Sequence, residues 1–224
     1  MLFERAKILF ATLWLRMLHR PGGNGFTRVG TDYGGWTIPV ELVESSWVCY
    51  TAGVGEDTSF DQELLGLGCE VVAIDPTPRA IEHIAPLLAQ HERLRLAPYA
   101  LWSEDGSIEF FPPASSEHVS YSVVNSEASA SPILVAARNL MSVATEFGHT
   151  KIDLLKVDIE GAEYSVLPSL DLGRIGVKIL CVEYHNVHGV RRMVSDIARV
   201  KDQGYEVAFV RRTDVTFISK GLMR

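Results

Sequence analysis

Residues 46–75 read "SWVCYTAGVGEDTSFDQELLGLGCEVVAID" and alternate two apolar runs with a helix-like segment. The run "SWVCY" predicts a buried strand, and "DTSFDQELLGLG" predicts a helix with Thr58 or Ser59 as its N-cap. The run "CEVVAID" predicts a second strand that ends at Asp75. Between the first strand and the helix, the turn carries Gly53 and Gly55. This order predicts parallel strands joined by a helical crossover.

The same alternation continues to the C-terminus. Further helices are predicted at "PTPRAIEHIAPLLAQH", "RNLMSVATEFG" and "VRRMVSDIARVKDQG". Further strands are predicted at "RLRLAPYAL", "SIEFF", "IDLLKVD" and "VKILCVEYH". The closing pair "YEVAFV" and "VTFISK" predicts a hairpin that adds one antiparallel edge strand. The fold class is therefore α/β, with a doubly wound, mostly parallel sheet covered on both faces.

The N-terminal segment differs in character from the rest. Residues 1–35 predict an amphipathic helix followed by a glycine-dense, mobile connector, and residues 36–224 predict one domain. The uncharged run 8–15 is far shorter than the roughly 20 apolar residues that span a bilayer. We expect this helix to pack on protein, either its own domain or a second subunit in a homo-oligomer, in preference to a membrane surface.

Charge and cysteine content exclude several classes. With 21 basic and 28 acidic residues the net charge is −7, so binding to a nucleic-acid backbone is not expected. The three cysteines are scattered and form no CxxC pair, which argues against a zinc site or a disulfide framework. Free thiols inside apolar strands predict a reducing, cytoplasmic location.

In open α/β sheets, ligands bind beyond the carboxyl ends of the strands. The strand ends here deliver the glycines, then Asp75, then Asp158 with Glu160, and finally Glu183 with His185. A carboxylate in the place of Asp75 accepts hydrogen bonds from a ribose diol, and the glycines allow backbone to approach a ligand closely. These features predict a nucleoside-bearing cofactor.

Glu56 and Asp57 narrow the choice of cofactor. Two carboxylates in a phosphate cradle would repel a pyrophosphate, whereas S-adenosylmethionine carries a sulfonium cation and an amino group. The alternative is that both residues simply start the next helix, where negative charge suits the helix dipole. Both interpretations can hold together. No tyrosine has a lysine four residues later, as many oxidoreductases of this architecture require.

The segments "VCYTAGVGEDTSFD", "VVAIDPTP", "IDLLKVDIEGAEYSVL" and "CVEYH" together resemble the FkbM family of class I S-adenosylmethionine-dependent methyltransferases. The resemblance runs from about Ser46 to the C-terminus. It implies a Rossmann-like seven-stranded sheet with one antiparallel strand. It also implies O-methylation, commonly of sugars or of hydroxyls on glycosylated or polyketide products. A mycobacterial-type enzyme of polymethylated mannose polysaccharide synthesis is one specific form of this expectation.

The resemblance also implies a set of cofactor contacts. The family has an acidic residue before the glycines, where this chain has Tyr50 and Thr51, so Glu56 or Asp57 would hold the methionine amino group instead. Ala100, Leu101 and Trp102 would lie near the adenine. The full predicted set is Gly53, Gly55, Glu56, Asp57, Ser59, Asp75, Pro76, Thr77, Ala100, Leu101, Trp102 and Asp158.

A sugar hydroxyl is a weak nucleophile and needs a general base or a metal. We hypothesise that Asp158 and Glu183 bind Mg²⁺ and that His185 or Glu160 takes the proton. Alternatives are open at each position. Asp158 and Glu160 could contact the cofactor or cap the next helix, Glu183 could pair with Lys156, and His185 could be structural.

The acceptor is expected to be a small glycan or glycoside. The serine-rich segment 112–131 is long for a connector and predicts a binding loop. The predicted substrate contacts are His118, Tyr121, Asn125 and Tyr184. The alternatives are methylation of a polyketide or lipid hydroxyl, a nicotinamide-dependent oxidoreductase, and a cofactor-binding protein without catalysis.

Overall fold

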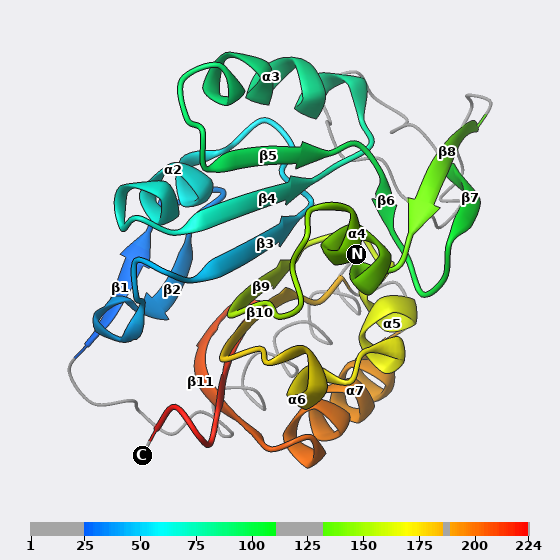
Figure 1. Cartoon of the computed structure of the whole chain (residues 1–224). Coiled ribbons are helices and arrows are strands. Elements are labelled where there is room, and N and C mark those ends of the chain that lie inside the picture. The colour runs from blue at the N-terminus through cyan, green and yellow to red at the C-terminus, as the bar shows by residue number, and fades with distance from the viewer. Residues whose placement is uncertain (1–24, 111–131, 186–188, 224) are drawn as a thin grey trace.

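The computed structural model describes residues 25–110, 132–185 and 189–223. Within them the centre of the molecule is a seven-stranded sheet of order β11-β12-β10-β9-β3-β4-β5 (Figure 1). Its strands are β3 (Val48–Ala52), β4 (Glu70–Ile74), β5 (Leu94–Ala97), β9 (Leu154–Val157), β10 (Ile179–Glu183), β11 (Tyr205–Arg211) and β12 (Asp214–Ser219). The predicted α/β sheet is confirmed.

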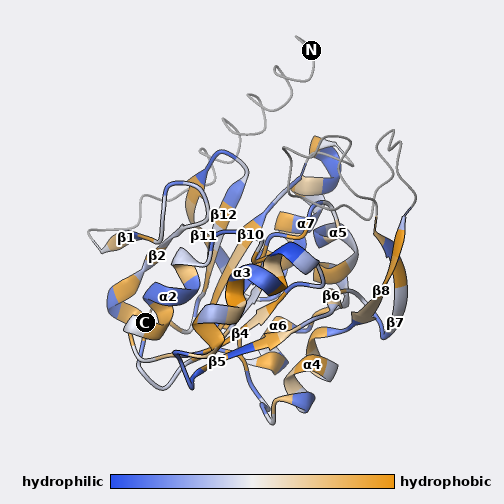
Figure 2. Ribbon diagram, turned by 90° about the horizontal axis from the view of Figure 1, so that it is seen from above, coloured by the Kyte–Doolittle hydropathy of each residue, from blue (hydrophilic) through white to orange (hydrophobic). Residues whose placement is uncertain are grey.

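Strands β3, β4, β5, β9 and β10 are mutually parallel. All four residues of β9 are buried, as are four of the five in β3, β4 and β10. Figure 2 shows hydrophobic residues along these central strands. Burial on both faces explains why their sequences are continuous apolar runs instead of alternating ones. Because the strands are parallel, the residues that follow each of them meet at one edge of the sheet.

One detail of the predicted sheet is wrong. The antiparallel strand β12 is not at the edge, because it pairs antiparallel with β10 on one side and β11 on the other. After β10, helix α7 (Val190–Asp202) leads to β11, which does not pair with β10 but lies one strand further out, at the edge of the sheet. The short turn after β11 then returns β12 into the gap, where both of its sides find ladder partners.

The helices divide between the two faces of the sheet (Figure 1). On one face, Phe60 and Leu64 of α2 (Ser59–Gly66) and Ile84 of α3 (Pro78–Leu88) pack on the side chains of Cys49 and Val71. The opposite face is covered by α4 (Leu140–Glu146), α5 (Glu163–Val166), α6 (Leu172–Ile175) and α7, with the short 3-10 helix η2 (Leu167–Ser169) among them. The doubly wound arrangement predicted from the sequence is therefore present.

The predicted connector is folded over residues 26–35. Strand β1 (Phe26–Val29) pairs antiparallel with β2 (Trp36–Pro39), which leads into the 3-10 helix η1 (Val40–Leu42). Val29, Trp36 and Ile38 are buried in the same cluster as α2. A domain boundary between residues 35 and 36 would divide this hairpin. Residues 1–24, where the N-terminal helix is predicted, lie outside the described residues.

The predicted strand "RLRLAPYAL" is two strands. β5 ends at Ala97, and β6 (Ala100–Leu101) belongs to a separate three-stranded sheet with β7 (Gly106–Phe110) and β8 (Ile133–Arg138). Pro98 has no N–H to donate to a ladder, and the Tyr99 N–H turns back to the Ala97 carbonyl at 2.8 Å.

The described residues contain no helix long and apolar enough to cross a bilayer.

Candidate methyl-transfer site

A cavity of about 460 Å³ opens at the carboxyl ends of the parallel strands. It has the size of a small-molecule site, and it lies where ligands bind in open α/β sheets. Most of the residues predicted for the site line it. These are Gly53, Gly55, Glu56, Asp57, Asp75, Pro76, Thr77, Ala100, Leu101, Asp158, Glu160, Glu183 and His185.

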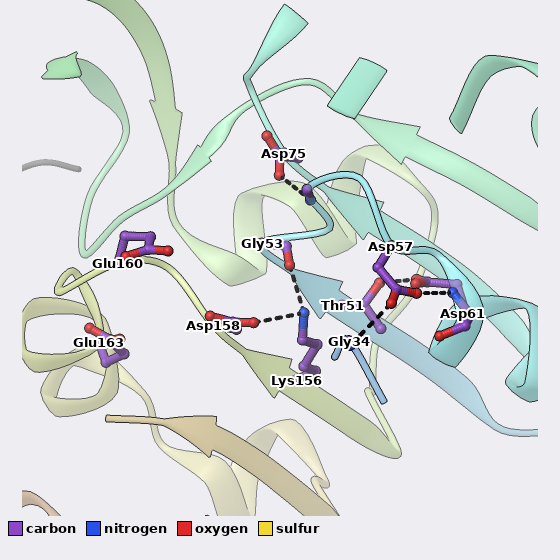
Figure 3. Close-up of polar contacts among 12 residues, drawn as sticks. Gly34, Thr51, Gly53, Asp57, Asp61, Asp75, Lys156, Asp158, Glu160 and Glu163 are labelled. Atoms are coloured by element: carbon purple, nitrogen blue, oxygen red, sulfur yellow. Dashed lines mark hydrogen bonds and ion pairs between the residues drawn. The ribbon is translucent and has the colours of Figure 1, made fainter. Parts of the chain in front are cut away.

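The glycine turn is tied to the segment after β9 by a buried lysine. The Lys156 ammonium donates to the Gly53 carbonyl at 2.6 Å and pairs with the Asp158 carboxylate at 3.2 Å (Figure 3). Burial would lower the pKa of Lys156, but the negative charges of Asp158 and Asp61 raise it. The alternative that Lys156 serves as the ion-pair partner of Glu183 is not what the structure shows, because its ammonium pairs with Asp158.

Gly53 and Gly55 both adopt positive φ, but their surroundings differ. A Cβ on Gly53 would lie 1.5 Å from the Asp158 carbonyl oxygen, whereas a Cβ on Gly55 would meet nothing within 4 Å. We therefore expect Gly53→Ala to lower the free energy of unfolding by about 3–5 kcal/mol, through backbone strain and overpacking. Gly55→Ala should cost only the strain, about 1–2 kcal/mol. Urea denaturation of the two variants measures the difference, and equal losses would contradict this account of the turn.

The carboxylate of Asp75, directly after β4, holds the glycine turn by hydrogen bonds. One of its oxygens accepts from the Gly55 N–H at 3.0 Å (Figure 3). The other accepts from the Thr77 N–H at 2.9 Å and from the Thr77 hydroxyl at 2.6 Å. The carboxylate is buried yet lines the cavity. It is thus held rigidly at the position predicted for a ribose contact.

Asp57 is engaged by protein donors. Its carboxylate accepts from the Thr31 hydroxyl, from the Gly34 N–H at 3.1 Å and from the Ser59 N–H at 2.9 Å. Burial would raise the pKa of Asp57, but these hydrogen bonds lower it. The contact with Ser59 starts α2, which favours the helix-start interpretation. The contacts with Thr31 and Gly34 give Asp57 a second task that the sequence did not reveal.

The resemblance predicts an acidic residue before the glycines, where this chain has Tyr50 and Thr51. Thr51 has a hydrogen-bond partner of its own. The hydroxyl of Thr51, two residues before Gly53, donates to the carboxylate of Asp61 at 2.5 Å (Figure 3). Asp61 belongs to α2 and is buried, and burial raises its pKa although the Thr51 hydroxyl opposes the shift. A carboxylate therefore lies behind the turn, supplied from the helix instead of from the strand.

Three donor groups converge beside the glycine turn. One ligand atom each from Asp158, Glu183 and His185 lies within 4.8 Å of the others. Burial, and next the negative charge of Asp158, raises the pKa of Glu183 to about 8. Asp214 faces Glu183 across the β10–β12 ladder, and burial, followed by the charge of Asp158, raises its pKa to about 6. This crowding of carboxylates is the environment that a cation would relieve.

His185 is held between two carboxylates and is not a free base. Its Nδ1 contacts the buried Glu163 carboxylate, and its Nε2 lies 3.2 Å from Glu160. Burial would lower the pKa of His185, but the hydrogen bond to Glu163 and the charges of Glu163, Glu160 and Glu183 raise it to about 10. The neighbouring carboxylates therefore favour the charged imidazole, whereas a cation bound beside them would favour the neutral one. That His185 accepts the proton stays a prediction, and its contacts with Glu163 and Glu160 also suit the structural role left open above.

Glu160 has an unusual backbone. Its φ is +52°, a left-handed conformation that residues with a Cβ adopt at a cost. It lines the cavity about one-third exposed and is followed by Gly161, also at positive φ. Strained residues of this kind are concentrated at functional sites. The observation is consistent with the predicted role of Glu160 near the reacting atoms.

Two segments at the rim of the cavity were not predicted from the sequence. They are the β1–β2 loop, represented by Asp32, Tyr33 and Gly34, and the β11–β12 turn, residues 211–214. Tyr99, Phe110, Lys156 and Ile159 also line the cavity. The glycine pair in "TDYGG" was the only local signal for the first segment, and it predicts a turn without saying what that turn faces.

Three predicted contacts are corrected. Tyr184 is fully buried in the core below the sheet edge, so it cannot touch a substrate. Trp102 follows β6, and its backbone N–H donates to the Arg138 carbonyl. Its side chain is not among the residues that line the cavity. Ser59 lies behind the turn and accepts from the Thr31 N–H at 2.8 Å. His118, Tyr121 and Asn125 lie outside the described residues.

Comparison with known proteins shows the family of the chain. The sequence profile described as "Methyltransferase FkbM domain" matches residues 50–207, which is most of the chain. The chain therefore belongs to the FkbM methyltransferase family. The glycine turn and Asp75 stand where the sequence predicts the S-adenosylmethionine site.

Individual relatives match over shorter segments. "Probable methyltransferase-like protein 24" of Rattus norvegicus is 33% identical and that of Homo sapiens 35% identical, each over 124 residues. The match covers 55% of this chain but only 28% of each relative. A solved precorrin-6y C5,15-methyltransferase from Geobacter metallireducens is 11% identical, with a TM-score of 0.46 over 90% of this chain and 99% of that one.

Proposed function

We propose that the protein transfers a methyl group from S-adenosylmethionine to a hydroxyl of a sugar or small glycan, assisted by a divalent cation. The observation that carries the proposal is the convergence of Asp158, Glu183 and His185 within 4.8 Å, beside the glycine turn. Such a set binds a cation next to the place where the cofactor is expected. A cation bound there would acidify an acceptor hydroxyl.

The chain offers a contact for each part of the cofactor. The backbone at Gly53 and Gly55 can approach it closely, and the fixed carboxylate of Asp75 can accept from the ribose hydroxyls. Ala100 and Leu101 are buried residues on the cavity wall and would cover the adenine. Holding the methyl group in line with the acceptor oxygen supplies much of the rate in a displacement reaction.

The donor set fits a divalent cation. Carboxylate oxygens of Asp158 and Glu183 suit Mg²⁺, the predicted ion, while a nitrogen from His185 would favour a metal such as Mn²⁺. Glu163 contacts Nδ1 of His185, so it fixes the ring and leaves Nε2 directed toward the cavity side. A carboxylate behind a histidine is the usual outer support of a metal ligand. His185 is thus better placed as a ligand than as a base.

Glu160 is the group we assign to take the acceptor proton. It lies at the cavity within 3.2 Å of His185, and its strained backbone aims the side chain into the site. A positioned carboxylate typically contributes about 10²- to 10⁴-fold to the rate.

The acceptor class follows from the polarity of the cavity. Asp158, Glu160, Glu183 and Asp214 all face it, and an apolar chain would strip water from these carboxylates without returning hydrogen bonds. A polyol replaces that water with hydroxyl donors. This favours a glycan or glycoside over a polyketide or lipid. A mannose oligomer is the specific acceptor that the sequence resemblance suggests.

The experiment is mass spectrometry of a glycan pool incubated with the protein, isotopically labelled S-adenosylmethionine and Mg²⁺ or Mn²⁺. We expect a methylated glycan, and we expect EDTA treatment to abolish it and added cation to restore it. Full activity after EDTA would refute the metal, and methylation of lipid acceptors alone would refute the glycan. Binding of the cofactor without any transfer would indicate a member of the family that has lost catalysis.

A further inference from the structure

Tyr33 is the most exposed large hydrophobic residue in the described part of the chain, and it lines the cavity. Its side chain is 83% exposed at the tip of the β1–β2 loop. The carboxylates of Asp158, Glu160 and Glu183 line the same cavity. An exposed aromatic ring at the mouth of a polar cavity marks a contact surface more often than a packing accident.

The loop that carries Tyr33 is fixed to the cofactor turn. Asp57 accepts from the Thr31 hydroxyl and from the Gly34 N–H, one residue on each side of the loop tip. The Ser59 hydroxyl accepts from the Thr31 N–H at 2.8 Å. The loop is therefore anchored to the same "GEDTS" segment that begins the cofactor site.

The opposite side of the loop is fixed by arginines. Arg211, from the β11–β12 turn, donates to the Asp32 carbonyl at 2.9 Å and approaches the Asp32 carboxylate at 3.3 Å. Arg28 donates to the Thr31 and Asp32 carbonyls at 3.2 and 3.1 Å. The glycines are tightly packed as well, because a Cβ on Gly34 would lie 2.6 Å from Asp57 and one on Gly35 would lie 2.4 Å from a backbone oxygen.

These contacts make Tyr33 a preorganised group. Hydrogen bonds and close glycine packing fix the six-residue loop 30–35, but the aromatic ring at its tip is exposed to water. Burying the ring would have been more favourable for stability alone. Because the loop backbone is already fixed, a ligand that contacts the ring does not have to order the loop, and only the two side-chain torsions of Tyr33 are restricted on binding.

We propose that Tyr33 is the stacking platform for the acceptor, binding the apolar C–H face of a pyranose ring while the carboxylates of the cavity meet its hydroxyls. Asp57 is the positioning residue that holds this platform against the cofactor turn. The proposal rests on the proposed function and names the acceptor-binding residue of that same site. A pyranose suits both surfaces, since one face presents C–H groups to a ring and the edge presents hydroxyls to acceptors.

The test compares Tyr33→Ala and Tyr33→Phe with Leu134→Ala, in which another exposed apolar residue, on β8 and away from the cavity, is truncated. We expect Tyr33→Ala to raise KM for the glycan about five- to tenfold, from the loss of one aromatic contact. Tyr33→Phe and Leu134→Ala should stay within about twofold of the wild type. The Kd for S-adenosylmethionine, measured by calorimetry, should be unchanged in all three.

Saturation-transfer NMR with the glycan and S-adenosylhomocysteine supplies a readout that does not depend on turnover. In the wild type, C–H protons of one sugar face should receive saturation, and Tyr33→Ala should lose that pattern. If the wild type binds and methylates the glycan but Tyr33→Ala is unchanged, the platform is refuted and the proposed function survives. If the wild type neither binds nor methylates any glycan but accepts a cationic or lipid acceptor, both proposals fail.

Discussion

Replacing Glu183 with glutamine is expected to lower kcat by about 10²- to 10⁴-fold, the range for loss of a metal-assisted or acid–base contribution. Glutamine keeps the shape of the side chain but loses the charge that would bind the cation beside Asp158 and His185. The melting temperature should not fall, because burial and the charge of Asp158 already disfavour the charged form of Glu183, and glutamine resembles the neutral carboxyl in shape. The affinity for S-adenosylmethionine should be unchanged.

The matched control is Glu206→Gln on β11. Glu206 pairs with Lys220 at 3.4 Å and Lys201 at 3.9 Å and does not line the cavity. Surface pairs of this kind contribute little, so we expect wild-type kcat. Titration with Mn²⁺, followed by electron paramagnetic resonance, reports metal affinity directly. If Glu183→Gln retained both metal affinity and kcat, the cation site would have to be placed elsewhere.

The second large effect is expected at Asp75. Asp75→Asn should weaken S-adenosylmethionine binding about 100-fold or more, because two hydrogen bonds from a ribose diol to a charged acceptor are lost or weakened. The amide also presents an N–H toward either Gly55 or Thr77, whose own N–H groups now point at the carboxylate. The turn is therefore expected to lose order together with the ribose contact.

Calorimetry with S-adenosylmethionine and with NAD measures this effect. Asp202→Asn, an exposed carboxylate at the end of α7, serves as the control and should bind the cofactor like the wild type. We expect no NAD binding to any of these proteins. Wild-type affinity in Asp75→Asn would remove Asp75 from the cofactor site, and tight NAD binding would overturn the assignment of the cofactor itself.

Much of the cofactor side could be predicted from sequence because it depends on local pattern. Parallel strands show as continuous apolar runs, and the residue after each run must lie at the same edge of the sheet, so Asp75, Asp158 and Glu183 were placed together correctly. The role of His185 could not be predicted in the same way. Its ring is held by Glu163, which approaches it from a different element, α5.

The acceptor side depended on contacts that have no local signal. Residues 26–35 are glycine-rich and read as a connector, although long-range bonds from Asp57 and Arg211 fix them to the domain. The position of β12 was also hidden, since a hairpin signal states that two strands pair but not which of them joins the sheet. The prediction for Tyr184 was wrong because side chains along a strand alternate between faces. Its neighbours Glu183 and His185 line the cavity, whereas Tyr184 is buried in the core.

The cavity is lined by residues from inside and from outside the segment that the family profile matches. The family profile spans residues 50–207, which contain the glycine turn, Asp75 and the three converging donor groups. Tyr33 and Arg211, which frame the mouth, both lie outside that span. If Tyr33 binds the acceptor as proposed, the residues for methyl transfer and those for choice of acceptor lie in separate stretches of chain. On that proposal, we expect a graft of the two flanking loops from another family member to change the acceptor without changing the affinity for S-adenosylmethionine.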